Sequence, residues 1–243
     1  MPVVIILSGG GVKSAVAAAR YAKDHELVFL HVNHGQPAAA RECAAIDRLA
    51  QHWKNARVVR ATLPHMSQLH SAGGADARES DTRVSRGIVG SVSGIGTGTP
   101  VGAKGLLPVL CSLGLQAALG YRAVSVVLGL TRSDDAAHLG LSGIETHPDL
   151  RREFLHAFNI MSETLLRPRT AIKLEAPLVE IQYHEVMMLA RRFQIPLEHT
   201  WTCAHAGSSP CLQCSFCRAR SAACTQAGMA DPLVTRPFAA ANA

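Results

Sequence analysis

Residues 3–14 read VVIILSGGGVKS. The first five are apolar and mostly β-branched, which predicts a strand buried on both faces of a sheet. Glycines follow, and an alanine-rich stretch to about residue 23 then predicts a helix. Glycines between a strand and a helix let backbone amides approach an anion at the positive end of the helix, so this loop predicts phosphate binding. The spacing excludes a Walker A loop, because Leu7 stands where that motif needs glycine, and it also excludes G-x-G-x-x-G.

Strand and helix patterns alternate along the rest of the chain. We expect further strands at residues 27–32, 57–61, 123–128 and near 172, and helices at residues 37–53, 106–119, 148–165 and 183–193. This alternation predicts an α/β fold built on a doubly wound, mostly parallel five-stranded sheet. Residues 71–100 are dense in glycine, serine and threonine and predict a mobile insertion. The nucleotide-binding domain is expected to span residues 1–199.

Four cysteines stand close together near the C-terminus, in the pattern C-x7-C-x2-C-x2-C: Cys203, Cys211, Cys214 and Cys217. Four thiols at this spacing predict a closed tetrahedral zinc site with a structural role, since zinc binds four thiolates and has no redox chemistry. The other cysteines, Cys43, Cys111 and Cys224, are expected to be packing residues, although Cys224 stays open as an exchangeable ligand. The metal-binding segment is expected to cover residues 200–224, followed by a tail of residues 225–243.

Composition narrows the class of protein. The 243 residues are 48% hydrophobic and 17% charged, which is typical of one compact domain and excludes disorder. A net charge of +6 and a pI near 9.1 favour an anionic partner, but the basic residues are scattered, so a solvated surface is preferred to a nucleic-acid groove. The N-terminus has no signal-peptide pattern, and the apolar stretch at residues 106–118 is too short to span a bilayer. With the cysteine pattern, this predicts a cytoplasmic protein with no membrane partner.

Several short motifs elsewhere in the chain are informative together with the glycine loop. They are NHGQ at residues 33–36, KG at 104–105, GLTRSD at 129–134, HPDLRREF at 147–154, and Thr200-Trp201 and Arg218 around the cysteines. The loop resembles the S-G-G-x-D-S pyrophosphatase loop (PP-loop) of the adenine nucleotide α-hydrolase superfamily. Within that superfamily the chain is similar to the 7-cyano-7-deazaguanine synthase (QueC-type) family. The resemblance implies a Rossmann-like PP-loop fold.

The resemblance also implies an activity. Enzymes of this family bind ATP and Mg²⁺ and adenylate the carboxylate of 7-carboxy-7-deazaguanine. Ammonia displaces AMP to give an amide, and a second activation dehydrates the amide to the nitrile, a queuosine precursor. The chain is therefore expected to be an ATP-dependent C–N ligase whose partners are ATP, a deazapurine acid and an amine donor, and to form a homodimer.

Individual roles follow from the same resemblance. Catalysis on the phosphates is implied for Lys13, Ser14 and Lys104. Nucleotide binding is implied for Ser8, Gly9, Gly10, Gly11, Lys13, Ser14, His31, Asn33, His34 and Gly35, with the segment after the second strand at the switch point of the sheet. Substrate binding is implied for Asp134, Asp149 and Arg151, and the two carboxylates suit a deazaguanine edge or Mg²⁺. From the residues alone, Asp149 is equally a helix-start residue and Arg151 equally a solvated side chain.

The chain departs from the family pattern in ways that leave alternatives open. Lys13 replaces the Asp of the loop, with Ser8 or one glycine displaced by one residue. Lys104 replaces an Arg, and His34 and His147 replace tyrosines. One alternative keeps the activation but transfers the acyl group to a protein amine, as in anti-phage conjugation. Another is a catalytically silent protein that binds a nucleotide or deazapurine. A zinc-ribbon nucleic-acid module is disfavoured, because only 5% of the residues are aromatic.

Overall fold

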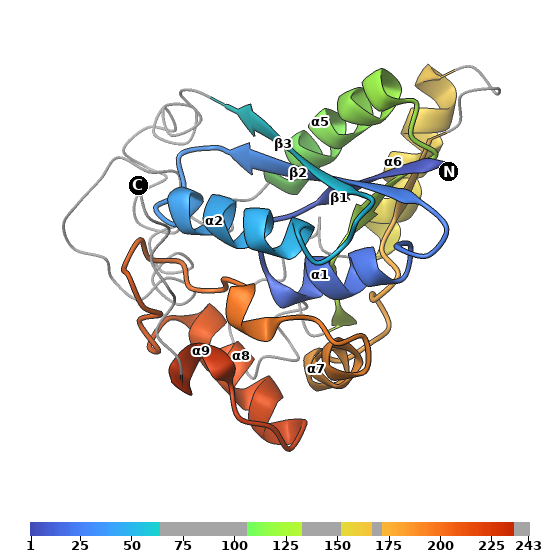
Figure 1. Ribbon diagram of the computed structural model, residues 1–243. Coiled ribbons are helices and arrows are strands. Elements are labelled where there is room, and N and C mark those ends of the chain that lie inside the picture. The colour runs from blue at the N-terminus through green and yellow to red at the C-terminus, as the bar shows by residue number, and fades with distance from the viewer. Residues whose placement is uncertain (64–105, 133–151, 167–171, 236–243) are drawn as a thin grey trace.

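The computed structural model describes residues 1–63, 106–132, 152–166 and 172–235. The expected insertion at residues 71–100 lies outside these ranges, as do Lys104, Asp134, His147, Asp149 and Arg151. The described strands form one parallel sheet in the order β3-β2-β1-β4-β5 (Figure 1). Their bounds are Val3–Leu7 (β1), Glu26–Asn33 (β2), Ala56–Thr62 (β3), Ser125–Leu128 (β4) and Lys173–Glu175 (β5). The predicted α/β fold with a five-stranded sheet is confirmed.

Strand β1 is the central strand, as its sequence predicts. It pairs with β2 on one side and with β4 on the other. Val4, Ile5 and Ile6 have no exposed surface, because strands flank them and helices cover both faces. Val4 and Ile6 belong to one apolar cluster and Ile5 to another, so successive residues of β1 fill the two opposite cores.

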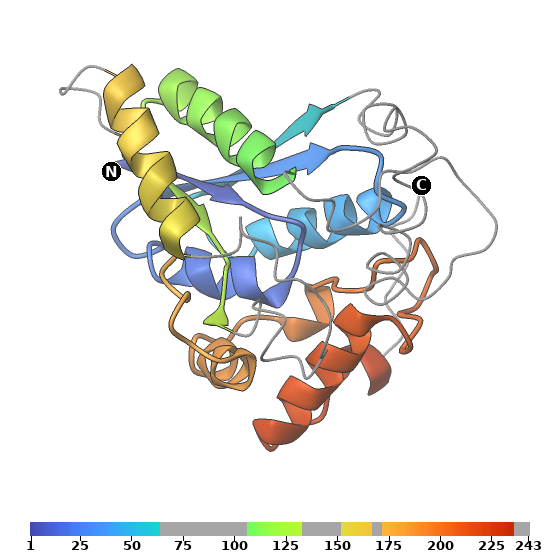
Figure 2. The same cartoon turned by 180° about the vertical axis from the view of Figure 1, so that it is seen from behind.

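Helices pack on both faces of the sheet (Figures 1 and 2). Helices α1, α2 and α7 contribute to the first core and helices α5 and α6 to the second. Their bounds are Val12–Ala19 (α1), Ala39–Ala50 (α2), Leu106–Tyr121 (α5), Arg152–Leu165 (α6) and Tyr183–Arg192 (α7). Helices α1 and α2 are shorter than the alanine-rich sequence predicts, and α1 ends at Ala19 rather than near residue 23.

The order of strands places the switch point of the sheet between β1 and β4. The chain passes from β1 to its neighbour β2 on one side, and reaches β4 on the other side after α5. Two loops meet at the carboxyl ends of these strands, the glycine loop after β1 and the segment that begins at Gly129. The expectation that residues 31–35 lie at the switch point is wrong, because β2 is separated from β4 by β1.

The C-terminal part of the chain contains helices that the sequence did not predict. They are η5 (Leu197–His199), α8 (Ser215–Gln226) and α9 (Pro232–Thr235). Helix α8 begins directly after Cys214 and packs Ala223 and Cys224 into the first core, beside α7. The described residues contain no helix with the length and apolar character needed to cross a membrane.

Candidate functional site

The glycine loop lies closely packed against helix α2. Gly10 has φ +73°, and a Cβ added there would stand 2.8 Å from the Ala45 Cβ and 2.9 Å from the Glu42 carbonyl oxygen. A side chain at this position would meet both a strained backbone conformation and a steric clash. Gly129 is also tightly constrained, since an added Cβ would stand 2.6 Å from the Ser14 nitrogen. These close approaches bring the glycine loop, helix α2 and the segment after β4 together at the N-terminus of α1.

Two serine hydroxyls brace the loop from within. Ser14 Oγ donates to the Gly11 carbonyl at 2.9 Å, so the 2.7 Å contact between Ser8 and Ser14 has Ser8 as the donor. The Gly10 N–H donates to Ser8 Oγ at 3.1 Å. Gly11 is the N-cap of α1, without a side-chain cap, and the first turn contains no acidic residue. The positive end of the helix therefore receives no compensation from a capping side chain or an acidic first turn.

Helix α1 begins at Val12, so the loop proper consists of Ser8 to Gly11. Counted from Ser8 without a gap, the Asp of S-G-G-x-D-S falls on Val12 and its second Ser on Lys13, whereas the expectation that Lys13 replaces the Asp includes a displacement of one residue. Val12 is buried in the first core. The Lys13 ammonium lies over the ring of Tyr183 at the start of α7, with Nζ 4.5 Å from the ring centre. This cation–π contact holds the Lys13 side chain toward α7.

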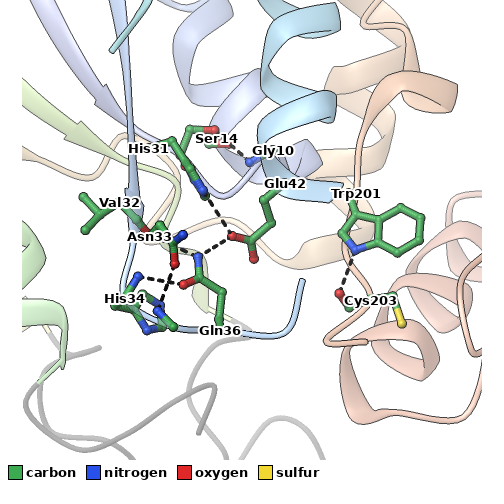
Figure 3. Close-up of polar contacts among 12 residues, drawn as sticks. Gly10, Ser14, His31, Val32, Asn33, His34, Gln36, Glu42, Trp201 and Cys203 are labelled. Carbon is green, nitrogen blue, oxygen red and sulfur yellow. Dashed lines mark hydrogen bonds and ion pairs between the residues drawn. The ribbon is translucent and has the colours of Figure 1, made fainter. Parts of the chain in front are cut away.

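A buried polar network lies beneath the loop (Figure 3). His31 Nδ1 is 3.2 Å from the Ser8 carbonyl oxygen, and His31 Nε2 is 3.8 Å from Glu42 Oε2. Gln36 Nε2 donates to the same Glu42 oxygen at 2.7 Å and to the Val32 carbonyl at 3.2 Å. The network joins the end of β2, the start of α2 and the first residue of the glycine loop.

Burial changes the protonation of both ionisable groups in this network. Desolvation raises the pKa of Glu42 to about 7, and the Gln36 hydrogen bond opposes that rise. Desolvation also lowers the pKa of His31, against the Ser8 hydrogen bond. Neither Glu42 nor Gln36 was selected from sequence as a site residue. A Gly-Gln pair after the second strand is the only signal that pointed toward them.

The segment after β2 is held by hydrogen bonds between its own residues. The Gly35 N–H donates to Asn33 Oδ1 at 3.0 Å, and the His34 N–H donates to Gln36 Oε1 at 2.8 Å. Gly35 has φ +93°, and the His34 side chain is buried. His31 is 1% exposed, so it supports the loop from below. Nucleotide contacts of residues 31–35 stay a prediction.

The four cysteines converge, as their spacing predicts. All four Sγ atoms lie within 4.8 Å of one another, and Cys211 Sγ is 4.0 Å from Cys217 Sγ. Backbone N–H groups of His205 and Cys211 each donate to Cys203 Sγ at 3.4 Å. Such donors favour the thiolate form that binds metal. Cys224 is packed in the first core rather than in this group.

The cysteine segment rests directly on the glycine loop. The Trp201 N–H donates to the Gly10 carbonyl at 2.8 Å, and the Trp201 indole N–H donates to the Cys203 carbonyl at 2.8 Å. The Trp201 side chain is 1% exposed and has the Arg41 guanidinium over its ring at 5.9 Å. One residue therefore connects the cysteine group to the glycine loop.

Arg220 on α8 holds this segment in place. Its guanidinium is 2% exposed and makes two hydrogen bonds to the Asp231 carboxylate, at 2.8 and 2.9 Å. Its remaining N–H groups donate to the Thr200 and Thr202 hydroxyls and to the Leu197 carbonyl. The family resemblance selects Arg218 instead, two residues earlier, whose side chain is exposed.

The family follows from comparison with known proteins. A model of the family described as "Queuosine biosynthesis protein QueC" matches residues 2–228. The chain belongs to this family. It is 26% identical over 233 residues to the 7-cyano-7-deazaguanine synthase of Chlorobium phaeobacteroides (strain BS1), covering 96% of both chains. It is 28% identical over 240 residues to the 7-cyano-7-deazaguanine synthase of a Nitratiruptor species, covering 96% of this chain and 98% of the relative.

Among solved structures, the chain is similar to the "U34-tRNA thiolase NcsA from Methanococcus maripaludis with its [4Fe-4S] cluster". The TM-score is 0.46 at 15% identity, over 93% of this chain and 66% of that one. For this QueC-family chain, the structure brings the glycine loop, the β2 segment and the cysteine group together around Gly10. Phosphate contacts of Lys13 and Ser14 stay predictions.

Proposed function

We propose that this protein is an ATP-dependent synthase that activates the carboxylate of 7-carboxy-7-deazaguanine, or of a similar deazapurine acid, as an acyl adenylate. Ammonia then displaces AMP to form an amide, which a second activation converts to the nitrile. The support is membership of the QueC family together with the uncapped start of α1 behind the glycine loop. A carboxylate needs a leaving group before an amine can attack it, and adenylation provides one.

The residues of the loop suit the binding of a nucleotide triphosphate. The Gly10 conformation and the Ser8–Ser14 contact hold the loop against α1, where backbone amides and the helix end attract phosphate. Lys13 is a nearby cation whose ammonium lies over the Tyr183 ring. Mg²⁺ bound with the triphosphate would neutralise its charge. Lys104, Asp134, Asp149 and Arg151 remain part of this proposal as phosphate and substrate contacts.

We infer that the cysteine group binds zinc in a structural role. A tetrahedral ion with sulfur ligands at about 2.3 Å places the sulfurs roughly 3.8 Å apart. The observed separations, 4.0 Å for one pair and at most 4.8 Å for all, need little adjustment to reach that geometry. A four-iron cluster binds each thiolate to a different iron and needs the sulfurs further apart. The homodimer and the cytoplasmic location also stay proposals.

The test is incubation of the zinc-loaded protein with ATP, Mg²⁺, 7-carboxy-7-deazaguanine and ammonium, with AMP and the deazapurine products measured. Formation of AMP with amide or nitrile is the expected result. AMP with a deazapurine-modified protein would instead indicate transfer to a protein amine. Absence of AMP with every acceptor tested would refute the proposal that the protein is an enzyme.

One observation favours a second candidate, a catalytically silent nucleotide or deazapurine binder. Counted without a gap, Val12 stands at the Asp position of the family loop, and its side chain is buried. A silent binder would bind ATP tightly without forming AMP, and the variant Val12→Asp would not gain turnover. Turnover by the unmodified protein excludes this candidate.

A further inference from the structure

Formation of a C–N bond from ammonium requires a proton acceptor near the activated carboxyl group. Glu42 is a carboxylate placed beside the glycine loop, since its carboxyl carbon and Oε1 each lie 3.7 Å from the position of a Gly9 Cβ. Gln36 orients one of its oxygens through the 2.7 Å hydrogen bond to Oε2. The side chain retains 19% exposure, so it is not fully sealed from solvent.

His31 lies directly behind this carboxylate. The Ser8 carbonyl can only accept a hydrogen bond, so His31 Nδ1 carries the proton and Nε2 bears a lone pair. Nε2 is buried, has no hydrogen-bond partner among the described residues, and is 3.8 Å from Glu42 Oε2. A neutral imidazole forms no ion pair with the carboxylate, so His31 does not stabilise the ionised form of Glu42.

We propose that Glu42 is the general base that takes a proton from the amine donor, with Gln36 as the residue that orients it. The inference rests on the proposed function. Glu42 carboxylate removes one proton from ammonium, which gives ammonia and neutral Glu42. The nitrogen lone pair forms the C–N bond as the acyl C–O bond to AMP breaks, and AMP leaves with that electron pair. The extra proton on the new amide nitrogen passes to solvent, as does the proton held by Glu42, which restores the carboxylate.

The protonation behaviour of Glu42 agrees with this role. Burial raises its pKa to about 7 against the opposing effect of the Gln36 hydrogen bond, and His31 on β2 is a titratable group that faces it. A base is most effective when its pKa lies near the working pH, because it is then both deprotonated and able to hold a proton. An ordinary surface glutamate would be a much weaker base.

The variant Glu42→Gln separates this role from nucleotide binding. Gln keeps the size and an oxygen for the Gln36 bond but cannot accept a proton. We expect ATP–pyrophosphate exchange, which needs no amine, to stay within about twofold of wild type, while amide formation from ammonium falls by at least about 10²-fold. Hydroxylamine is largely unprotonated at neutral pH, so hydroxamate formation should be retained. The matched control is Glu26→Gln, at the opposite end of β2, where Glu26 pairs with Arg57.

The pH profile gives a second measurement. At a fixed, subsaturating ammonium concentration, the wild-type rate should level off above about pH 7, where Glu42 is deprotonated. The Glu42→Gln rate should instead keep rising about tenfold per pH unit with free ammonia. Equal loss of exchange, hydroxamate and amide formation in Glu42→Gln would overturn the inference, as would a wild-type rate that follows free ammonia. Wild-type protein without exchange would overturn the proposed function itself, and this inference with it.

Discussion

Replacement of Arg220 by Met should destabilise the C-terminal segment far more than the same replacement of an exposed arginine. Arg220 makes hydrogen bonds from each of its guanidinium nitrogens, and its carboxylate partner Asp231 is only 9% exposed. Removal of one partner of a buried ion pair leaves an uncompensated charge, which costs about 3–5 kcal/mol. We therefore expect Arg220→Met to lower the free energy of unfolding by about 3–5 kcal/mol.

The assay is urea unfolding of the zinc-loaded protein, followed by Trp201 fluorescence. Trp201 is buried in the affected segment, and Trp53→Phe as the common background leaves it the sole tryptophan. Arg218→Met on the same helix is the control and should change the unfolding free energy by less than about 0.5 kcal/mol. A double variant with Asp231→Asn should cost less than the sum of the two single changes, because no buried charge is then left unpaired.

A loss below about 1 kcal/mol for Arg220→Met, or a loss equal to that of Arg218→Met, would refute this reasoning. It would mean that the segment is held by its apolar contacts and its metal, and that the guanidinium contributes little beyond them.

Two further predictions concern the glycine loop and its support. Gly10→Ala should weaken ATP binding and destabilise the fold by at least about 1–2 kcal/mol, because the left-handed conformation and the 2.8 Å approach to Ala45 both oppose a side chain. Gly120→Ala on α5, where an added Cβ meets no atom of the described residues within 4 Å, should be neutral or stabilising in the same thermal and binding measurements. Removal of zinc by a chelator should lower both the melting temperature and the affinity for ATP, since Trp201 joins the cysteine segment to Gly10. Unchanged ATP affinity in the metal-free protein would show that the loop does not depend on this contact.

The sequence alone determined the features that depend on local patterns. An uninterrupted β-branched run predicted the buried central strand, because only a strand covered on both faces has no polar alternation. Glycines before an alanine-rich stretch predicted the loop at the start of α1, and cysteine spacing predicted a group that can share one ion. These features need only neighbouring residues, so composition and spacing reveal them.

The tertiary structure decided which distant residues meet. Glu42 gains its environment from Gly9, Gln36 and His31, which belong to different segments, and no local pattern distinguishes it from an ordinary first-turn glutamate. Arg220 is buried where Arg218 is exposed, because the rotation of α8 against η5 and α9 selects the inward position. The contact between Trp201 and Gly10 joins residues far apart in the chain. Burial and pKa arise from such packing, so they become visible only once the chain has folded.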